Sequence, residues 1–526
     1  AAETTEEVIV VTAHKREEPL LQVPVSVTAL GGETLLEQST ASLADYQSRI
    51  PGLGFNGTDI IDLSLRGIST GGGTNPTIAV TIDDVPVGSS SFIGQSPFPD
   101  LDPTDINRIE VLRGPQGTLY GANSLGGLIQ FVTNRPDTHE FSGRLEAGTE
   151  MVDGGDNGEY FRGAVNVPIL ADHVGLRLSA YKRDEAGYVD DVDGAADQNR
   201  QVVEGYRGAL LLQPLDSLAL ELATIHQESE GSGTGAIRVN SDSYDPTYGD
   251  LTTQTTPGAQ SQTTFDLHSL RATLDLGFAD LTSISGWSSY DLPAGNQDVS
   301  FIFAGLGGFY GSAPPNTRAL LTEGTTTGRF TQELRLTSNG EGRIDWLIGT
   351  FYTDEETEKG QRVDLYTAAG AFLGTPVTTG TPTFYTETAL FGDITYHFNE
   401  QFDLQLGGRY SEIEQNYTST ITPDPVIPPF IFGPPSTESN LDNDEVFTWV
   451  LTPRYRFNED LMAFARIATG YRPGSPNTAV PGAPAASDSD SVTSYELGLK
   501  GYLFDRFLTF DGAIFQVDWE DIQLQN

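Results

Sequence analysis

The chain has 526 residues, and its 73 Asp and Glu against 29 Lys and Arg give a formal net charge of −44. Binding to phosphate backbones needs an excess of Lys and Arg, so this charge excludes nucleic acid as a partner. The chain contains no cysteine, which excludes a disulfide framework and any thiolate metal site.

The pattern of apolar residues narrows the fold class. No run of about 18 apolar residues occurs, which excludes a transmembrane helix but leaves open a membrane barrel, whose strands only alternate. With 58 Gly, 27 Phe and 20 Tyr, the composition favours strands and turns over helical bundles. The chain opens at Ala1 and Ala2 without a basic region or an apolar core, which we interpret as a mature form after removal of a signal peptide.

Residues 1–18 contain a short β-branched run. It consists of Glu7, Val8, Ile9, Val10, Val11, Thr12 and Ala13. If this run is extended and exposed, its backbone can add as an edge strand to the sheet of a partner protein. The alternative is that it forms an ordinary first strand of the domain that follows.

Residues 19–137 contain short, mixed elements, which predict a compact α/β domain. Predicted strands cover residues 24–28, 60–66, 77–82, 106–111 and 129–133. A helix is predicted over residues 40–49, with Thr40 as its N-cap and Pro51 and Gly52 ending it.

Residues 138–526 repeat one pattern of about ten alternating residues followed by a turn. In residues 402–410, for example, Phe402, Leu404 and Leu406 fall on one face and the polar residues between them fall on the other. Short turns alternate with long Gly-, Pro- and Asp-rich connections, and aromatic residues lie near strand ends. These features favour an all-β transmembrane barrel over a soluble β-sandwich, which gives similar alternation.

The segments between residues 141 and 524 amount to about 15 strands. Bacterial single-chain barrels close with even strand numbers, and the roughly 22 strands of plugged transporters would need on the order of 180 more residues. We therefore expect the barrel to be incomplete at the carboxy-terminal end of this chain.

Two sets of sequence blocks are distinctive. The first set is Ile50 to Leu53, Leu65 to Ile68, Ile82 to Pro86, and Arg108 to Pro115 continuing through Gly117 to Gly121 and Gly126 to Ile129. The second set, within the repeated strands, is Gln332 to Leu336, Gly470 to Gly474 and Ser494 to Lys500. Together these blocks resemble the TonB-dependent receptors of the outer membrane. The similarity covers nearly the whole chain, and it departs from the family pattern at Asn123 and Ser124, where smaller residues are usual.

The resemblance implies a plug domain inside the barrel lumen and a TonB box at residues 7–13. The implied partners are TonB with its inner-membrane ExbB/ExbD motor, the lipid and lipopolysaccharide of a Gram-negative outer membrane, and a small-molecule ligand. It also implies charge pairs that clamp plug to barrel, formed by Arg66, Arg113, Glu333 and Glu496. We expect Arg113 to pair with Glu333 or Glu496; the alternative is independent solvated charges.

The implied function is active import of a scarce ligand, most simply a ferric siderophore or similar iron complex. Oligosaccharides, vitamin B12 and aromatic compounds are alternative cargoes, and a passive surface adhesin or a soluble lectin are alternative functions. A receptor that also signals to gene regulation is less favoured, because only six residues precede the box. Expected ligand contacts lie in loops at Ser69, Asn75, Ser90, Phe92, Phe309 and Tyr310.

The sequence carries no enzymatic signature. The six histidines are scattered without metal-ligand spacing, and no HExxH, GxSxG or Walker pattern occurs. The acidic run at 190–194 resembles half of a calcium loop, but position 12 of that register is Arg200. We therefore expect no catalytic residue, no metal site and no cofactor.

Overall fold

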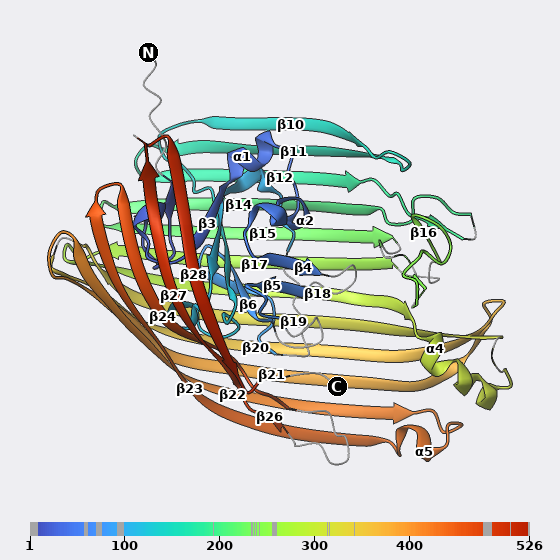
Figure 1. Ribbon diagram of the computed structural model, residues 1–526. Coiled ribbons are helices and arrows are strands. Elements are labelled where there is room, and N and C mark those ends of the chain that lie inside the picture. Colours follow the sequence, from blue (N-terminus) through green and yellow to red (C-terminus); the bar gives the residue numbers. More distant parts are fainter. Residues whose placement is uncertain are drawn as a thin grey trace.

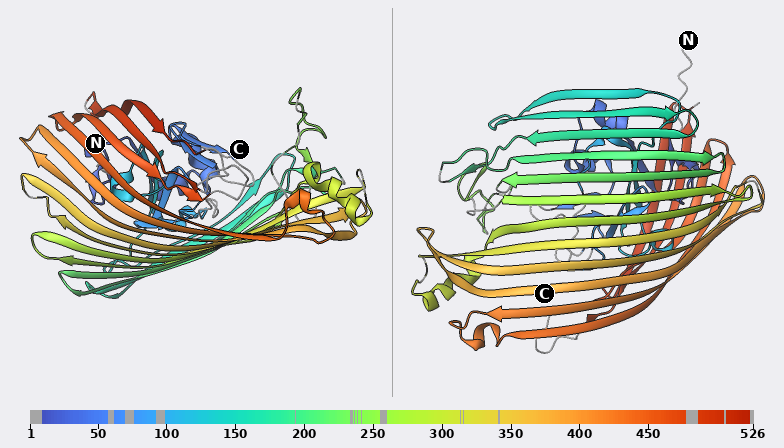
Figure 2. Two further views of the ribbon diagram at one scale, coloured as in Figure 1. Left: turned by 90° about the horizontal axis from the view of Figure 1, so that it is seen from below. Right: turned by 180° about the vertical axis from the view of Figure 1, so that it is seen from behind.

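The computed structural model describes the chain except for residues 1–8, 57–61, 70–75, 92–98, 193, 233–234, 236, 238, 241, 255–259, 313, 315, 341, 477–485, 505 and 524–526. A large antiparallel sheet curves around a small domain that lies on its concave face (Figures 1 and 2). We call the large sheet the wall and the domain of residues 19–137 the plug. None of the described helices is long and apolar enough to cross a membrane.

The wall has 15 strands, and each is hydrogen-bonded to the next wall strand along the chain. The strands are β10 (Ser142–Met151), β11 (Asn157–Leu170), β12 (Val174–Glu185), β14 (Gln201–Leu215), β15 (Leu218–Ser232), β17 (Gln260–Asp275), β18 (Ala279–Asp298), β19 (Thr317–Ser338), β20 (Ile344–Thr367), β21 (Phe372–His397), β22 (Phe402–Pro423), β23 (Ser436–Asn458), β24 (Leu461–Arg472), β27 (Asp490–Leu503) and β28 (Leu508–Glu520). Among the described residues, β10 and β28 form the two edges of this sheet. The predicted strand count is confirmed.

Short elements lie in the long connections of the wall. Two-residue strands pair there as β13 (Asp190–Asp191) with β16 (Thr252–Thr253) and as β25 (Ser475–Pro476) with β26 (Ala486–Ser487). The short helices are α4 (Ser300–Phe303), η5 (Ala304–Tyr310) and α5 (Pro429–Phe432).

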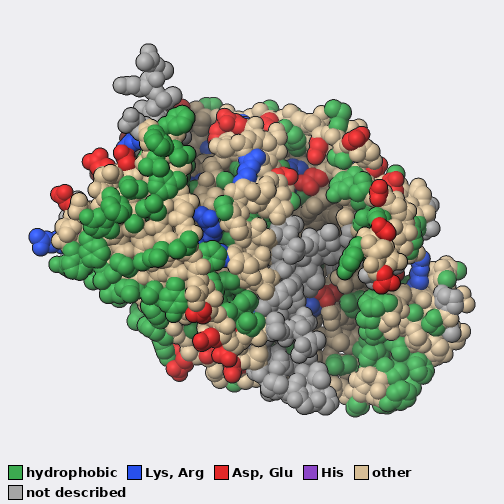
Figure 3. Space-filling view, viewed as in Figure 1, with side chains coloured by type: hydrophobic (Ala, Val, Ile, Leu, Met, Phe, Trp, Pro, Cys, Tyr) green, Lys and Arg blue, Asp and Glu red, His purple; other side chains and the backbone are tan. Residues whose placement is uncertain are grey.

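The two faces of the wall differ in polarity. On β22, Asp403 and Arg409 are buried on the inner face, whereas Leu406 and Tyr410 are 48% and 40% exposed on the outer face. Tyr410 lies opposite Phe447 of β23, and Trp287 lies opposite Phe330, with ring centroids 5.3 Å apart. Hydrophobic side chains gather over the outer face of the last wall strands, at the left of Figure 3. An apolar outer face edged by aromatic residues is what a lipid-facing barrel requires.

The central strands are longer than a membrane crossing needs. Strands β19 to β23 have 22 to 26 residues, whereas a tilted strand crosses the hydrocarbon layer with about 9–11. Beyond Tyr410, the outward positions of β22 become Glu412 and Glu414, which are exposed carboxylates. The apolar band therefore ends near Tyr410, and the wall continues as a tall vestibule.

The plug contains a five-stranded sheet in the order β3-β8-β9-β6-β7. Its elements are β3 (Val27–Gly31), α1 (Gly32–Glu37), α2 (Leu43–Tyr46), η2 (Gln47–Arg49), β4 (Leu53–Asn56), β5 (Asp62–Leu65), β6 (Ile78–Ile82), β7 (Val85–Val87), η4 (Pro103–Asp105), β8 (Ile106–Arg113), α3 (Gly117–Tyr120) and β9 (Gly127–Thr133). Ahead of them lie β1 (Val10–Val11), β2 (Glu18–Pro19) and η1 (Leu20–Gln22).

The predicted N-cap at Thr40 is wrong. Helix α2 begins at Leu43 with Ser42 as its N-cap, because Ser42 and Asp45 form a reciprocal capping box. The predicted strand over 24–28 lies three residues later, as β3, and helix α1 was missed.

Plug and wall share one apolar core. Val80, Ile82 and Val85 of the plug belong to the same buried cluster as Phe265 and Leu267 of the wall. The plug is therefore packed onto the inner face of the strands, as the sequence predicted.

Candidate functional site

The amino-terminal segment, residues 9–19, is folded against the plug. Val10 and Val11 pair with Pro19 and Glu18 to form the hairpin β1–β2. Val11 and Ala13 are fully buried, whereas Ile9 is 49% exposed. The expectation that the whole run is an exposed edge is therefore wrong for Val11 and Ala13 in this conformation, because both are buried and Val11 already pairs with Glu18. Glu7 and Val8 lie outside the described residues.

Glu110 of β8 holds this segment in place. The Thr12 backbone N–H lies 2.9 Å from both Glu110 carboxylate oxygens, and the Thr12 hydroxyl donates to Oε1 at 3.0 Å. Burial raises the pKa of Glu110, although Arg108 at 2.8 Å and the bonds from Thr12 oppose that shift. The Tyr120 hydroxyl donates to the Thr12 carbonyl at 3.3 Å. Several of the bonds that tie the segment to the plug thus converge on one residue, Thr12.

Lys15 ties the same segment to the wall. Its Nζ lies 2.6 Å from Oε2 of Glu333, and both side chains are buried. The ammonium also lies 4.8 Å from the ring centroid of Tyr120 and 5.5 Å from that of Phe391. Burial lowers the pKa of Lys15, while Glu333 and Asp84 oppose that shift. A buried ammonium of this kind is stable only while its carboxylate partner is present.

The Lys15–Glu333 pair belongs to a larger network centred on Asp84. Arg335 Nη1 lies 2.9 Å from Glu333 Oε1, and its Nη2 lies 3.0 Å from Asp84 Oδ2. Arg271 reaches the same Asp84 oxygen at 3.0 Å. Although burial works in the opposite direction, Arg335, Arg271 and Lys15 hold the pKa of Asp84 well below its usual range. The network joins the amino-terminal segment, a plug turn and two wall strands.

The four residues expected to clamp plug and wall are paired differently from the expectation. Arg66 Nη2 lies 2.8 Å from Glu496 Oε2, and both side chains are buried. Arg113 pairs with neither glutamate: its Nε is buried without a hydrogen-bond partner among the described residues. Lys15 and Arg335 occupy Glu333, and Arg66 occupies Glu496, so neither glutamate pairs with Arg113.

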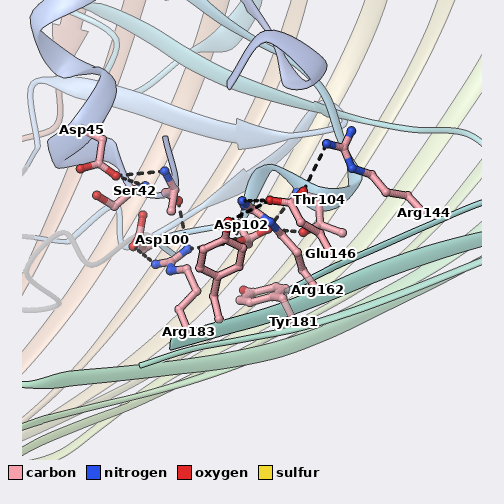
Figure 4. Close-up of polar contacts among 12 residues, drawn as sticks. Ser42, Asp45, Asp100, Asp102, Thr104, Arg144, Glu146, Arg162, Tyr181 and Arg183 are labelled. Carbon is pink, nitrogen blue, oxygen red and sulfur yellow. Dashed lines mark hydrogen bonds and ion pairs between the residues drawn. The ribbon is translucent and has the colours of Figure 1, made fainter. Parts of the chain in front are cut away.

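A second set of buried charges, missed from the sequence, holds the opposite side of the plug. Asp100 and Asp102 face the guanidinium groups of Arg162 and Arg183 on β11 and β12 (Figure 4). The Arg183 Nη2–Asp100 Oδ2 distance is 2.5 Å, and Asp102 lies 3.5 Å from Arg183 and 3.6 Å from Arg162.

Asp105, at the end of η4, continues this set towards β14. Its Oδ2 lies 2.7 Å from Arg207 Nη1, and its Oδ1 contacts Arg177 of β12. The only sequence signal was three aspartates within residues 100–105. We call residues 99–105, with these arginine contacts, the acidic anchor.

The residues expected to contact a ligand differ in their exposure. Ser90 is buried, and its backbone N–H donates to Glu355 of the wall at 2.9 Å, so it is closed to a ligand in this conformation. Tyr310 packs against an apolar cluster under η5, while its neighbour Phe309 is 41% exposed. Ser69 is half-buried. Asn75 and Phe92 lie outside the described residues.

Comparison with known families decides what this arrangement is. Residues 19–128 match the TonB-dependent Receptor Plug Domain, and residues 215–526 match the TonB dependent receptor-like beta-barrel. The chain belongs to the TonB-dependent receptors. This family consists of receptors and transporters that work with TonB and bind small ligands. They are proteins of the Gram-negative outer membrane, and this receptor therefore resides in that membrane.

Individual relatives are distant. The pesticin receptor of Yersinia pestis is 24% identical over 99% of the chain and 71% of its own length. The hemin receptor of the same organism is 32% identical, over 35% of the chain and 24% of its own length. The crystal structure of the ferric yersiniabactin uptake receptor FyuA from Yersinia pestis superposes with a TM-score of 0.77 at 20% identity, covering 96% of the chain and 73% of FyuA. The siderophore receptor PiuA from Acinetobacter baumannii gives 0.73 at 15% identity, covering 95% and 73%. These superpositions show that the fold is shared.

Proposed function

We propose that this receptor imports a ferric siderophore or a related iron complex, using force that TonB and its ExbB/ExbD motor apply to residues 7–13. Support for the cargo comes from the relatives: the similar structures include a ferric yersiniabactin uptake receptor and a siderophore receptor, and the similar sequences include hemin receptors. The proposal includes no catalytic step and no resident cofactor, and it places the wall in contact with lipid and lipopolysaccharide.

The observation that carries the coupling is the position of Lys15. It lies two residues after the proposed TonB box and is bound to Glu333 of the wall at 2.6 Å. Force on residues 7–13 therefore reaches the Lys15–Glu333 pair before it reaches β3. Through Arg335, the pair connects to Asp84 in the plug. A pull strong enough to extract Lys15 leaves Glu333 and Asp84 with one cation fewer, so release of the segment loosens the plug turn as well.

The clamp residues enter the same proposal. Arg66 with Glu496 would hold plug and wall together, and Glu333 with Lys15 would hold the amino-terminal segment on the wall, until the segment is pulled. Arg113 would act as a spare cation next to Glu496 once Arg66 moves. Phe309 and the plug loops that contain Ser69, Asn75, Ser90 and Phe92 remain proposed ligand contacts, with Ser90 and Tyr310 available only after the loops rearrange.

Deletion of residues 6–13 tests the import function. Cells that depend on this receptor would be grown on a panel of ferric siderophores, haem, vitamin B12, oligosaccharides and aromatic compounds, under iron-starved and iron-replete conditions. We expect the full chain to support growth on an iron complex under starvation, and the deletion to bind that complex while failing to import it. Growth on an iron-free compound would assign another cargo. Binding without energised uptake by the full chain would show a passive adhesin.

A further inference from the structure

The long connections of the wall carry few positive charges. They join the wall strands at the end opposite the one where Arg16 of the amino-terminal segment reaches Ser338 (Figure 1). We call this end the mouth, and its connections are residues 152–156, 186–200, 233–259, 299–316, 368–371, 424–435 and 473–489. The only Lys or Arg residues in their sequences are Arg200 and Arg238. Arg200 is paired with Asp184, and Arg238 lies outside the described residues.

The inner face of the wall next to the mouth has more carboxylates than cations. One row of direct cross-strand partners runs over β19 to β23, through Arg329, Glu355, Tyr385, Gln415 and Asp442. We call the inward side of these strands, from this row to the mouth, the upper inner face. Its charged residues are the basic Arg329 and Lys359 and the acidic Glu323, Glu355, Glu438 and Asp442. The face is therefore negative.

The other two basic residues of this part of the wall belong to the outer face. Arg318 and Arg362 each precede a residue of the buried inner cluster, Ala319 and Val363. Because side chains alternate along a strand, the two arginines point away from the interior of the wall.

Both cations of the upper inner face are already paired. Lys359 Nζ lies 3.0 Å from Glu323 Oε1. Arg329 Nη1 lies 3.9 Å from Glu355 Oε2 and donates to the Gly88 carbonyl of the plug at 3.3 Å. An anionic cargo would therefore have to break one of these pairs to gain a cation.

Two carboxylates of the same face have no such partner. Glu438 lies opposite Ser419, and Asp442 lies opposite the buried Gln415, so both face inward. Within the described part of the chain, neither has a basic side chain at ion-pair distance. On the plug, the exposed Arg49 lies four residues after the exposed Asp45, so that stretch adds no net charge.

The apolar part of the mouth is aromatic and almost uncharged. Residues 299–316 contain no charged residue, and residues 424–435 contain only Asp424. Phe301 of α4 and Phe430 of α5 are each 85% exposed. The face of an aromatic ring carries negative partial charge, so it attracts cations and accepts neutral apolar groups more readily than anions.

We propose that the mouth selects cargo by charge: it admits ferric complexes of zero or positive net charge and excludes anionic ones. This inference rests on the proposed import function and narrows its cargo. Three singly charged hydroxamate groups balance ferric iron, whereas three doubly charged catecholates leave the complex negative. The cargo class assigned here is therefore the tris-hydroxamate type. The formal net charge of −44 repels anions in the same sense at longer range.

Ferric complexes that differ only in charge test the selection. A linear tris-hydroxamate with a terminal amine gives a cationic ferric complex, its N-acetyl derivative a neutral one and its N-succinyl derivative an anionic one. We expect the purified receptor to bind the succinylated complex at least fivefold more weakly than the acetylated one at low ionic strength. The difference should shrink as salt is added. Equal or tighter binding of the succinylated complex would overturn the proposal.

Matched double variants locate the effect. Glu438→Gln/Asp442→Asn removes the two uncompensated inner carboxylates, and the succinylated complex should then bind within twofold of the acetylated one. Glu412→Gln/Glu414→Gln removes two exposed carboxylates from the outer face of β22 at a similar height, since Glu414 lies opposite Asn443. This control should discriminate as the parent does. The same loss in both double variants would contradict the assignment to the inner face.

A thiol at position 440 reports the charge of the mouth without any cargo. If no ferric complex of any charge binds, the proposed import function fails, and the charge selection is decided by this measurement. The chain has no cysteine, and Asn440→Cys would lie between Glu438 and Asp442 on one face, about 7 Å along the strand from each. Both carboxylates are then within the Debye length of about 8 Å at physiological salt.

The readout is the rate at which a cationic and an anionic methanethiosulfonate modify this thiol, each divided by its rate with a free thiol. We expect the cationic reagent to be favoured at least threefold in Asn440→Cys. The preference should be lost when Glu438→Gln/Asp442→Asn is added and kept when Glu412→Gln/Glu414→Gln is added. Equal rates for the two reagents in Asn440→Cys, or a faster anionic reaction, would overturn the proposal.

Discussion

Removal of the Lys15 charge should release the amino-terminal segment from the wall. Lys15→Met keeps most of the side-chain volume but removes the ammonium that lies 2.6 Å from Glu333. Breaking a buried ion pair costs about 3–5 kcal/mol when the remaining charge is left alone. Here Glu333 keeps Arg335 at 2.9 Å. The loss is therefore closer to that of one charged hydrogen bond, about 1.5–3 kcal/mol.

That free energy predicts how often the segment detaches. At about 1.4 kcal/mol per factor of ten, Lys15→Met should raise the detached population roughly 10- to 100-fold. The assay is the rate at which a hydrophilic maleimide labels a single cysteine placed at Ala13, which is buried here. Local opening of the segment exposes that thiol.

Two variants act as controls for this measurement. His14→Ala removes a 2.8 Å contact with Glu18 that stays within the segment, so its labelling rate should change little. In the double variant Lys15→Met/Glu333→Gln, the labelling rate should rise by less than the two single-variant effects combined, because both substitutions act on one ion pair. A labelling rate for Lys15→Met within twofold of the parent would refute the reasoning.

Three further predictions concern the fit between plug and wall. Gly121→Ala places a Cβ 2.8 Å from Arg409 Nη2 at a residue with φ of +74°, so the melting temperature of the purified receptor should fall, by a destabilisation on the order of 1–3 kcal/mol. Asp105→Asn removes the carboxylate that faces the buried Arg207 and the half-buried Arg177, which costs up to about 3–5 kcal/mol and should expose the plug to protease, whereas the wall stays resistant. Because the pKa of Asp84 is lowered in the folded protein, its contribution to stability is fully present above the usual aspartate pKa range. That contribution is lost only as the pH falls through the lowered pKa of the folded state. Hydrogen exchange of the plug turn at residues 83–84 should therefore be unchanged between about pH 5 and 8 after correction for intrinsic rates.

The strands of the wall could be predicted from the sequence because the alternation that identifies them lies within each strand. Lipid on one side and plug or water on the other force a two-residue period, and residues 402–410 show it without reference to any partner strand. The same argument explains why buried polar residues such as Asp403 and Arg409 fall on one face of β22. The count of 15 strands followed from this period and from the turns between strands.

The ends of the short helices and strands of the plug were harder to predict from the sequence. Thr40 and Ser42 are both N-capping residues, and Asp45, three residues after Ser42, was the signal that favours the second. Helix α1 has only six residues, too few for an apolar period to stand out.

The pairing of charges across the lumen was not readable at all. Arg66 and Glu496 are neighbours only because the last wall strands fold back over the plug, and no local pattern distinguishes Arg66 from Arg113 as the partner. The burial of Lys15 could not be predicted either, because it also depends on residues distant in the sequence. Lys15 follows the β-branched run of residues 7–13, but the side chains that surround it are Tyr120 of the plug and Glu333 and Phe391 of the wall.

The central claim is that force on an extended amino-terminal strand drives import. Val10→Pro tests it most directly, because proline lacks the backbone N–H and cannot continue a paired strand. Val10→Ala is the control, because alanine keeps the N–H and can still pair. Uptake of the radiolabelled ferric complex would be measured beside its binding at the cell surface. We predict normal binding for both variants, near-normal uptake for Val10→Ala, and uptake by Val10→Pro no higher than in cells without TonB. Uptake by Val10→Pro at the parental rate would contradict the account.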